Sequence, residues 1–186
     1  MLSISEIKTG RNIILNNEPF SVVYHEHSKM GRAGAVLRTK LKNLTTGAMV
    51  EKTFQGAETV EEANITQSPA QYLYKEGDDG YVFMDMESYD QFTLTKEALA
   101  DITNYLTEGT EVTVLLWNDN PINITLPIKV ILEVTEAPPN IKGDTASGAT
   151  KQVTLQTGLV ITVPMFISSG DKILINTERG EYVSKA

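Results

Sequence analysis

The chain has 186 residues, of which 41% are hydrophobic and 22% are charged, and its formal net charge is −8. It contains no cysteine, which excludes disulfide scaffolds, thiolate zinc sites and cysteine nucleophiles. No apolar run approaches the length needed to cross a bilayer, and residues 1–6 lack the basic and apolar regions of a signal peptide. These features predict a cytoplasmic globular protein without a membrane anchor.

The first part of the chain predicts a small barrel. Asn16, Asn17 and Pro19 form a turn signal, and the run Thr45-Thr46-Gly47 forms another. Strand patterns lie on either side of these turns, at 13–15, 20–24, 36–44 and 49–54. Four or five short strands within roughly sixty residues are typical of a small β-barrel.

Residues 25–44 join a glycine-bracketed tip to a basic strand. Gly31 and Gly34 flank Arg32, and glycine permits positive φ on both sides of that side chain, which favours an exposed tip. The strand then alternates with a period of two, so that one face carries Leu37, Thr39 and Leu41 while the other carries Arg38, Lys40 and Lys42.

Two interpretations of the basic face are open from periodicity alone. Its cations protect a solvated hairpin edge against aggregation, or they bind an anionic partner. The neighbouring Lys29 and Arg32 favour the second interpretation.

The charge is distributed unevenly. Residues 1–64 carry eight Lys and Arg against seven Asp and Glu, a net +1, whereas residues 65–186 carry eight against seventeen, a net −9. Residues 25–56 carry six basic against two acidic side chains. Since the screening length at physiological salt is about 8 Å, distant acids do not cancel this local charge. RNA contact is therefore compatible with a negative total charge.

The remaining chain predicts two further barrels. An acidic connector at 56–63 predicts the first boundary, and the stretch 77–80 is strong hairpin chemistry. Thr95 is an N-cap for a single helix over about 96–106. Two successive five-strand patterns predict a duplicated oligonucleotide-binding (OB) type of barrel. The expected domains are 1–64, 65–127 and 128–186.

Aromatic residues cluster in the middle barrel, around the hairpin at 77–80. They form either a platform that stacks on bases or a barrel core, and the core is favoured because only Lys75 interleaves with them.

Enzymatic motifs are absent from the sequence. The only histidines are His25 and His27, which lie on one strand face and are expected to be a solvated pair rather than metal ligands. No phosphate-cradling loop and no Gly-x-Ser-x-Gly elbow occurs. We expect no catalytic residue, no metal and no cofactor.

Several segments resemble bacterial translation elongation factor P over essentially the whole chain. The most specific runs from Lys151 through Gly158 and Pro164 to Gly170, with Val153 where the family usually has alanine. Further matching segments are 40–47, 50–54, 81–85, 143–145 and 177–182.

The resemblance implies an all-β protein with an SH3-like, KOW-type first domain and two OB barrels in an L shape like that of transfer RNA. It implies a monomeric, non-enzymatic factor that binds the 70S ribosome between the P and E sites and relieves stalling at consecutive prolines. It places the tip loop, with Lys29, Gly31, Arg32 and Gly34, beside the P-site peptidyl-tRNA. It also places Gly143, Asp144 and Thr145 near the mRNA codon and ribosomal RNA of the E site.

The tip departs from the common family pattern. Many members carry Lys-Pro-Gly-Lys, whereas this chain has Lys29-Met30-Gly31-Arg32, so Arg32 takes the position that is modified in the family. This resembles a subgroup whose arginine is rhamnosylated by a glycosyltransferase, although that subgroup usually has Ser-Gly-Arg-Asn. An unmodified arginine, suited to bidentate phosphate contact, is the alternative.

Two other functions are kept as alternatives. An elongation factor P-like paralogue shares the arginine tip, but its C-terminal end usually departs from the Thr177–Tyr182 sequence found here. A free-standing oligonucleotide-binding module predicts salt-dependent binding of naked single strands, which the −9 on residues 65–186 disfavours.

Overall fold

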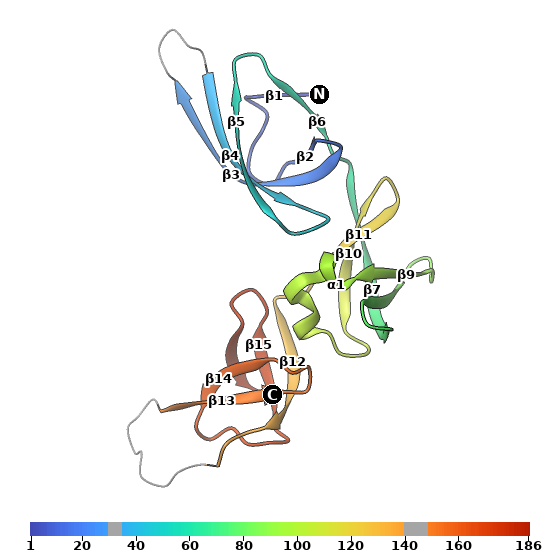
Figure 1. Ribbon diagram of the computed structural model, residues 1–186, viewed down its shortest axis with the longest axis vertical. Coiled ribbons are helices and arrows are strands. Elements are labelled where there is room, and N and C mark those ends of the chain that lie inside the picture. The colour runs from blue at the N-terminus through green and yellow to red at the C-terminus, as the bar shows by residue number, and fades with distance from the viewer. Residues whose placement is uncertain (30–34, 140–148) are drawn as a thin grey trace.

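The computed structural model describes residues 1–29, 35–139 and 149–186, which form three antiparallel sheets with one core each (Figure 1). The predicted all-β class is confirmed. The three domains follow a bent line, with the first and third at opposite ends of the second (Figure 1).

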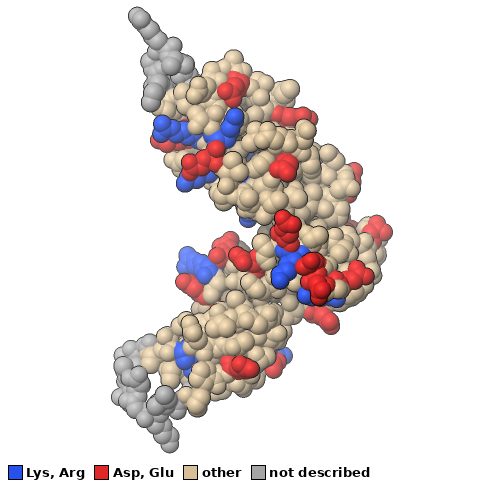
Figure 2. Space-filling model, in the orientation of Figure 1, with Lys and Arg blue, Asp and Glu red and all other residues tan. Residues whose placement is uncertain are grey.

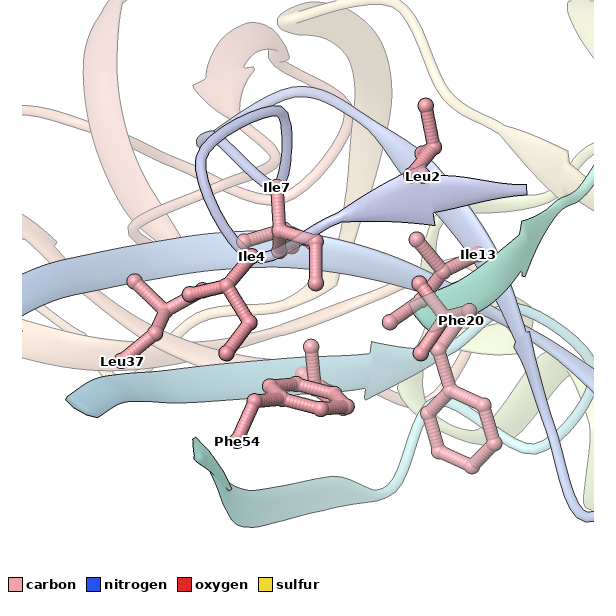
Figure 3. Close-up of a cluster of buried hydrophobic side chains, with 10 residues drawn as sticks. Leu2, Ile4, Ile7, Ile13, Phe20, Leu37 and Phe54 are labelled. Atoms are coloured by element: carbon pink, nitrogen blue, oxygen red, sulfur yellow. The ribbon is translucent and has the colours of Figure 1, made fainter. Parts of the chain in front are cut away.

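The first sheet has the strand order β1-β6-β2-β3-β4-β5. Its strands are β1 (Leu2–Ser3), β2 (Asn12–Leu15), β3 (Glu18–Lys29), β4 (Ala35–Asn43), β5 (Met49–Gln55) and β6 (Thr59–Glu62). Figure 3 shows the apolar side chains that the sheet encloses, including Ile7, Ile13, Leu37 and Phe54, all at most 2% exposed.

The prediction of an acidic connector at 56–63 is wrong. Residues 59–62 form β6, which pairs with β1 and β2 and completes the first sheet. Val60 is buried in the first core while Glu61 and Glu62 face solvent. Only one of the four β6 residues is buried and the other three are exposed, so this short inner strand resembles an acidic linker in the sequence.

Two hairpins turn on adjacent residues with positive φ. Asn16 and Asn17 have φ of 51° and 62°, and Asn118 and Asp119 have φ of 50° and 62°. Paired left-handed residues match type I′ turns, whose twist fits the twist of the flanking strands. Asn and Asp tolerate this backbone region better than other residues with a Cβ, so the turn predicted at Asn16 and Asn17 is confirmed.

The second and third sheets repeat one topology. The second sheet has the order β11-β10-β7-β8-β9, and the third has the order β14-β13-β12-β15-β16. When the five strands of each sheet are numbered in chain order, the third sheet read from its opposite edge gives the same order as the second. The duplicated barrel predicted from the sequence is confirmed. Their strands are β7 (Ile65–Glu76), β8 (Gly80–Asp85), β9 (Gln91–Thr95), β10 (Glu111–Trp117), β11 (Asn120–Thr125), β12 (Lys129–Glu136), β13 (Thr150–Leu155), β14 (Val160–Pro164), β15 (Lys172–Asn176) and β16 (Glu181–Lys185).

The single helix expected over 96–106 is two shorter helices. Thr95 caps α1 (Lys96–Leu99) by accepting a hydrogen bond from the Ala98 N–H, as predicted. A 3₁₀ helix, η2 (Ala100–Tyr105), then follows. Ala100 has φ 47° and ψ −124°, far from helical values, so the α-helix ends there.

The aromatic cluster of the middle barrel is core. Tyr72, Tyr81 and Phe83 are at most 8% exposed, and the Phe83 ring stacks on Phe92 with centroids 5.6 Å apart. Bases therefore have no access to these three rings, and the core interpretation is confirmed for them, whereas Tyr74 of the same cluster is 45% exposed.

Candidate nucleic-acid interface

The outer face of β4 presents three cations to solvent. Arg38, Lys40 and Lys42 are exposed, whereas the alternating Leu37, Thr39 and Leu41 are at most 3% exposed. The buried Thr39 hydroxyl donates to the Lys52 carbonyl at 2.8 Å, which satisfies its polar group inside the barrel. The predicted alternation of this strand is confirmed.

Two acids share this face with the cations. Glu26 on β3 lies opposite Arg38, and Glu51 on β5 lies opposite Lys40, with the Lys40 Nζ 3.4 Å from the Glu51 Oε1. Figure 2 shows blue and red side chains next to each other at this end of the first domain. Acidic and basic side chains therefore lie opposite each other on this face, and the cations are only slightly in excess. The six basic and two acidic residues counted along 25–56 thus overstate the positive electrostatic potential of the face.

The Lys40–Glu51 pair is weak and open to exchange. Both side chains are more than half exposed, at 55% and 77%. Exposed ion pairs contribute about 0–1 kcal/mol. A phosphate oxygen can therefore replace the Glu51 carboxylate beside Lys40 at little cost in free energy. The face thus suits contacts with the phosphate backbone of an RNA, which position the RNA without reading its sequence.

The tip loop and the predicted E-site loop fall outside the described residues. Lys29 is the last residue of β3 and pairs with Ala35, the first residue of β4. Met30–Gly34, which include Gly31 and Arg32, lie outside the described residues, as do Gly143, Asp144 and Thr145. Lys29 and Ala35, the residues on either side of the segment 30–34, are thus held next to each other by the pairing of β3 with β4.

The histidine pair is anchored by the first domain. The Thr9 N–H donates to the His25 Nδ1 at 3.1 Å, and the Thr9 hydroxyl lies 2.9 Å from the same nitrogen. The His25 and His27 rings meet edge to face with centroids 5.9 Å apart. Within the described residues, no group of three or more potential ligands is placed to hold a metal ion.

Comparison with known proteins decides the family. Residues 3–60 match the elongation factor P (EF-P) KOW-like domain, residues 65–124 the EF-P OB domain, and residues 130–185 the elongation factor P C-terminal domain. Elongation factor P from Dictyoglomus thermophilum is 46% identical over 186 residues, covering 100% of both chains. The chain belongs to the elongation factor P family.

Other elongation factor P relatives match at full length. Those from Carboxydothermus hydrogenoformans and Nostoc punctiforme are 45% and 42% identical over 185 residues and are also covered completely. The solved structure of eukaryotic translation initiation factor 5A from Methanococcus jannaschii matches with a TM-score of 0.55 at 22% identity, over 67% of this chain and 91% of that chain. This second likeness concerns the fold alone.

Membership of the elongation factor P family settles the general function. The protein is a non-enzymatic, cytoplasmic translation elongation factor that binds the ribosome and tRNA. The full-length matches leave no support for a free-standing oligonucleotide-binding module. Among the described residues, no helix is long and apolar enough to cross a membrane.

Sequence reasoning missed two asparagines. Asn43 and Asn123 each begin an Asn-x-Thr triplet, a pattern without meaning in a cytoplasmic protein. Both are nearly buried, at 5% and 8% exposure, and both make side-chain hydrogen bonds where the first and second domains meet. Asn43 shapes a local turn, but Asn123 bonds to Leu44 and Thr45, which are 79 and 78 residues away in the sequence, so no local pattern marks the contact between the two domains.

Proposed function

We propose that this elongation factor P promotes peptide-bond formation at consecutive prolines by holding the P-site peptidyl-tRNA through its tip loop. In this proposal Arg32 contacts the acceptor end of the tRNA, Lys29 assists it, and Gly31 and Gly34 allow the close approach. The observation that supports it is the pairing of β3 with β4 out to Lys29 and Ala35. This stiff ribbon brings both ends of the tip segment together.

The contribution of the factor is positional. Proline is a constrained, poor nucleophile, so its reaction depends strongly on the arrangement of the peptidyl-tRNA end. Holding that end in a near-attack arrangement lowers the entropic part of the barrier. Peptidyl transfer remains the chemistry of the ribosome.

The basic face of β4 is proposed to grip the tRNA backbone. Arg38, Lys40 and Lys42 spread along one strand at intervals of two residues, close to 7 Å for a strand rise of about 3.3 Å per residue. This spacing is similar to the separation of successive phosphates along a nucleic-acid strand. Phosphate contacts of this kind fix register and orientation.

The third domain is proposed to reach the E-site codon. Gly143, Asp144 and Thr145 connect β12 to β13 in the sequence, and the family resemblance assigns them to contacts with mRNA and ribosomal RNA. We also keep the domain boundaries after residues 64 and 127 as a proposal, supported by the short gaps between β6 and β7 and between β11 and β12.

Arg32 is proposed to be rhamnosylated by an arginine-specific glycosyltransferase of the host. The proposal rests on Arg32 standing where family members carry their modified side chain. A sugar would extend the guanidinium with hydroxyl groups that donate and accept hydrogen bonds. Intact-mass analysis of protein from the native host tests this: a deoxyhexose increment on the Arg32 peptide supports it, and an unmodified peptide leaves the bare arginine as the contact.

The proposed function is tested with a polyproline reporter in cells that lack the endogenous factor. Arg32→Ala is expected to lower reporter yield to near the factor-free level while ordinary translation is unchanged. The matched control is Arg179→Ala, which removes an exposed arginine from the β15–β16 turn of the third domain. Full reporter activity of the Arg32→Ala variant would refute the proposal.

A further inference from the structure

The turn between β4 and β5 is shaped by Asn43 and faces the second domain. The Asn43 Oδ1 accepts hydrogen bonds from the Thr45 and Thr46 N–H groups at 2.8 and 3.0 Å. Its Nδ2 donates to the Glu18 Oε2 at 2.8 Å. Asn43 thus fixes the conformation of the turn, and the carbonyl groups of Leu44 and Thr45 are left to other partners.

Asn123 on β11 of the second domain binds both of these carbonyls. Its Nδ2 lies 3.2 Å from the Leu44 oxygen and 3.4 Å from the Thr45 oxygen. The same nitrogen lies 3.1 Å from the carbonyl oxygen of Ala98 in α1. One amide group therefore connects the first domain, β11 and α1 at a single point.

The contact between the first and second domains requires a hydrogen-bond donor at residue 123. Three carbonyl oxygens converge on one nitrogen with two hydrogens, and Asn123 is only 8% exposed. A carboxylate there would face three acceptors without a proton to offer, and an alanine would leave the three carbonyls without their shared donor. A groove beside the contact is lined by residues of both domains, polar ones such as Lys42 and Thr46 and apolar ones such as Leu99.

We propose that Asn123 is a positioning residue that fixes the direction of the first domain relative to the second. The inference rests on the proposed function for its consequence, because the first domain carries the tip. β4 has nine residues and spans about 30 Å at about 3.3 Å per residue. A rotation of about 10° at its inner end would move its outer end by about 5 Å. A displacement of about 1 Å can cost about 100-fold in a positional effect.

The conformational test uses the absence of cysteine in this chain. Spin labels on Gln55→Cys and Thr93→Cys, both exposed and on different domains, report the inter-domain distance by pulsed electron resonance. The parent is expected to give one narrow distribution, Asn123→Asp a broad and shifted one, and Asn123→Ala an intermediate one. Asn120→Ala is the matched control on the same strand, because among the described residues the Asn120 Nδ2 donates only to the neighbouring Asn118 carbonyl. A narrow, unshifted distribution for Asn123→Asp overturns the inference.

Two additions keep the test decisive. Asn123→Ser retains a donor and is expected to recover part of the narrow distribution even where the aspartate variant is poorly folded. In the polyproline reporter, Asn123→Asp is expected to lower yield at least about threefold with the tip and basic face intact. Loss of activity in Arg32→Ala but not in Asn123→Asp overturns the positioning role alone. If neither variant lowers the reporter yield, the proposed function is overturned. The distance distributions then still test whether Asn123 fixes the direction of the first domain.

Discussion

At the scale of single residues, Ala100 of the second domain has a strained backbone. Its φ of 47° and ψ of −124° place a Cβ in a region that favours glycine. The residue begins η2, whose Tyr105 packs on the third core, and it follows α1, whose Ala98 carbonyl accepts a hydrogen bond from Asn123, the residue that also binds the first domain. The strain therefore occurs in a segment that packs on the third domain at one end and is bound at the other end to Asn123, which contacts the first domain.

Ala100→Gly is expected to stabilise the second domain by about 1 kcal/mol. Relief of strain contributes about 1–3 kcal/mol, and the greater chain entropy of glycine in the unfolded state subtracts about 0.4–1 kcal/mol. Urea unfolding followed by Trp117 fluorescence measures this, since Trp117 is the only tryptophan and lies on β10. Ala98→Gly, inside α1, is the control and is expected to destabilise by about 0.5–1 kcal/mol. Equal losses in both variants would contradict the strain argument.

At the scale of elements, the β8–β9 hairpin is held by one carboxylate. The Asp85 Oδ1 accepts hydrogen bonds from the Glu87 and Ser88 N–H groups at 2.8 and 2.9 Å. The Ser88 N–H is the main reason that the pKa of Asp85 is lowered from its ordinary value of 3.8. Tyr89 completes the turn with a φ of 63°.

The stabilising effect of Asp85 is expected to depend on pH. Because its pKa is lower in the folded state, its contribution is complete above the unfolded-state pKa and is lost as the pH falls through the folded-state value. Asp85→Asn is therefore expected to be less stable than the parent at pH 7 in urea unfolding, with the difference shrinking below the ordinary value of 3.8. Asp90→Asn is the control, because Asp90 enters the turn through its backbone. A difference independent of pH would refute this role.

At the scale of the whole molecule, Tyr105 joins the second domain to the third. Its side chain packs against the third core. Its hydroxyl group lies next to Gly180 of the third domain, where an added Cβ would be 3.2 Å from the hydroxyl oxygen. Burial raises the pKa of the Tyr105 hydroxyl above its ordinary value. The two ends of the α1–η2 segment thus lie at different domain contacts: Ala98 is hydrogen-bonded to Asn123, which binds the first domain, and Tyr105 packs on the third domain.

Tyr105→Ala is expected to free the third domain to tumble separately. Removing a large aromatic side chain from a packed contact costs about 3–5 kcal/mol when the side chain is fully buried, and a partly buried one loses less. Backbone ¹⁵N relaxation is expected to give a shorter correlation time for residues 149–186 than in the parent. Tyr89→Ala removes a 72% exposed ring and should change nothing. Identical correlation times in the two variants would show that Tyr105 does not join the domains.

The sequence by itself determined most of the strands, the predicted hairpin turns, the duplicated barrel and the buried and exposed faces of β4, because these follow from side-chain period and local backbone preference. Its resemblance to elongation factor P was confirmed over the whole chain. Only the tertiary structure decided that β6 completes the first sheet, that Glu51 shares the face of Lys40, and that Asn123 binds the turn after Asn43. The alternation of residues along a strand indicates which face a side chain lies on. Its neighbours on other strands and other domains depend on strand pairing and domain packing, which no local sequence pattern specifies.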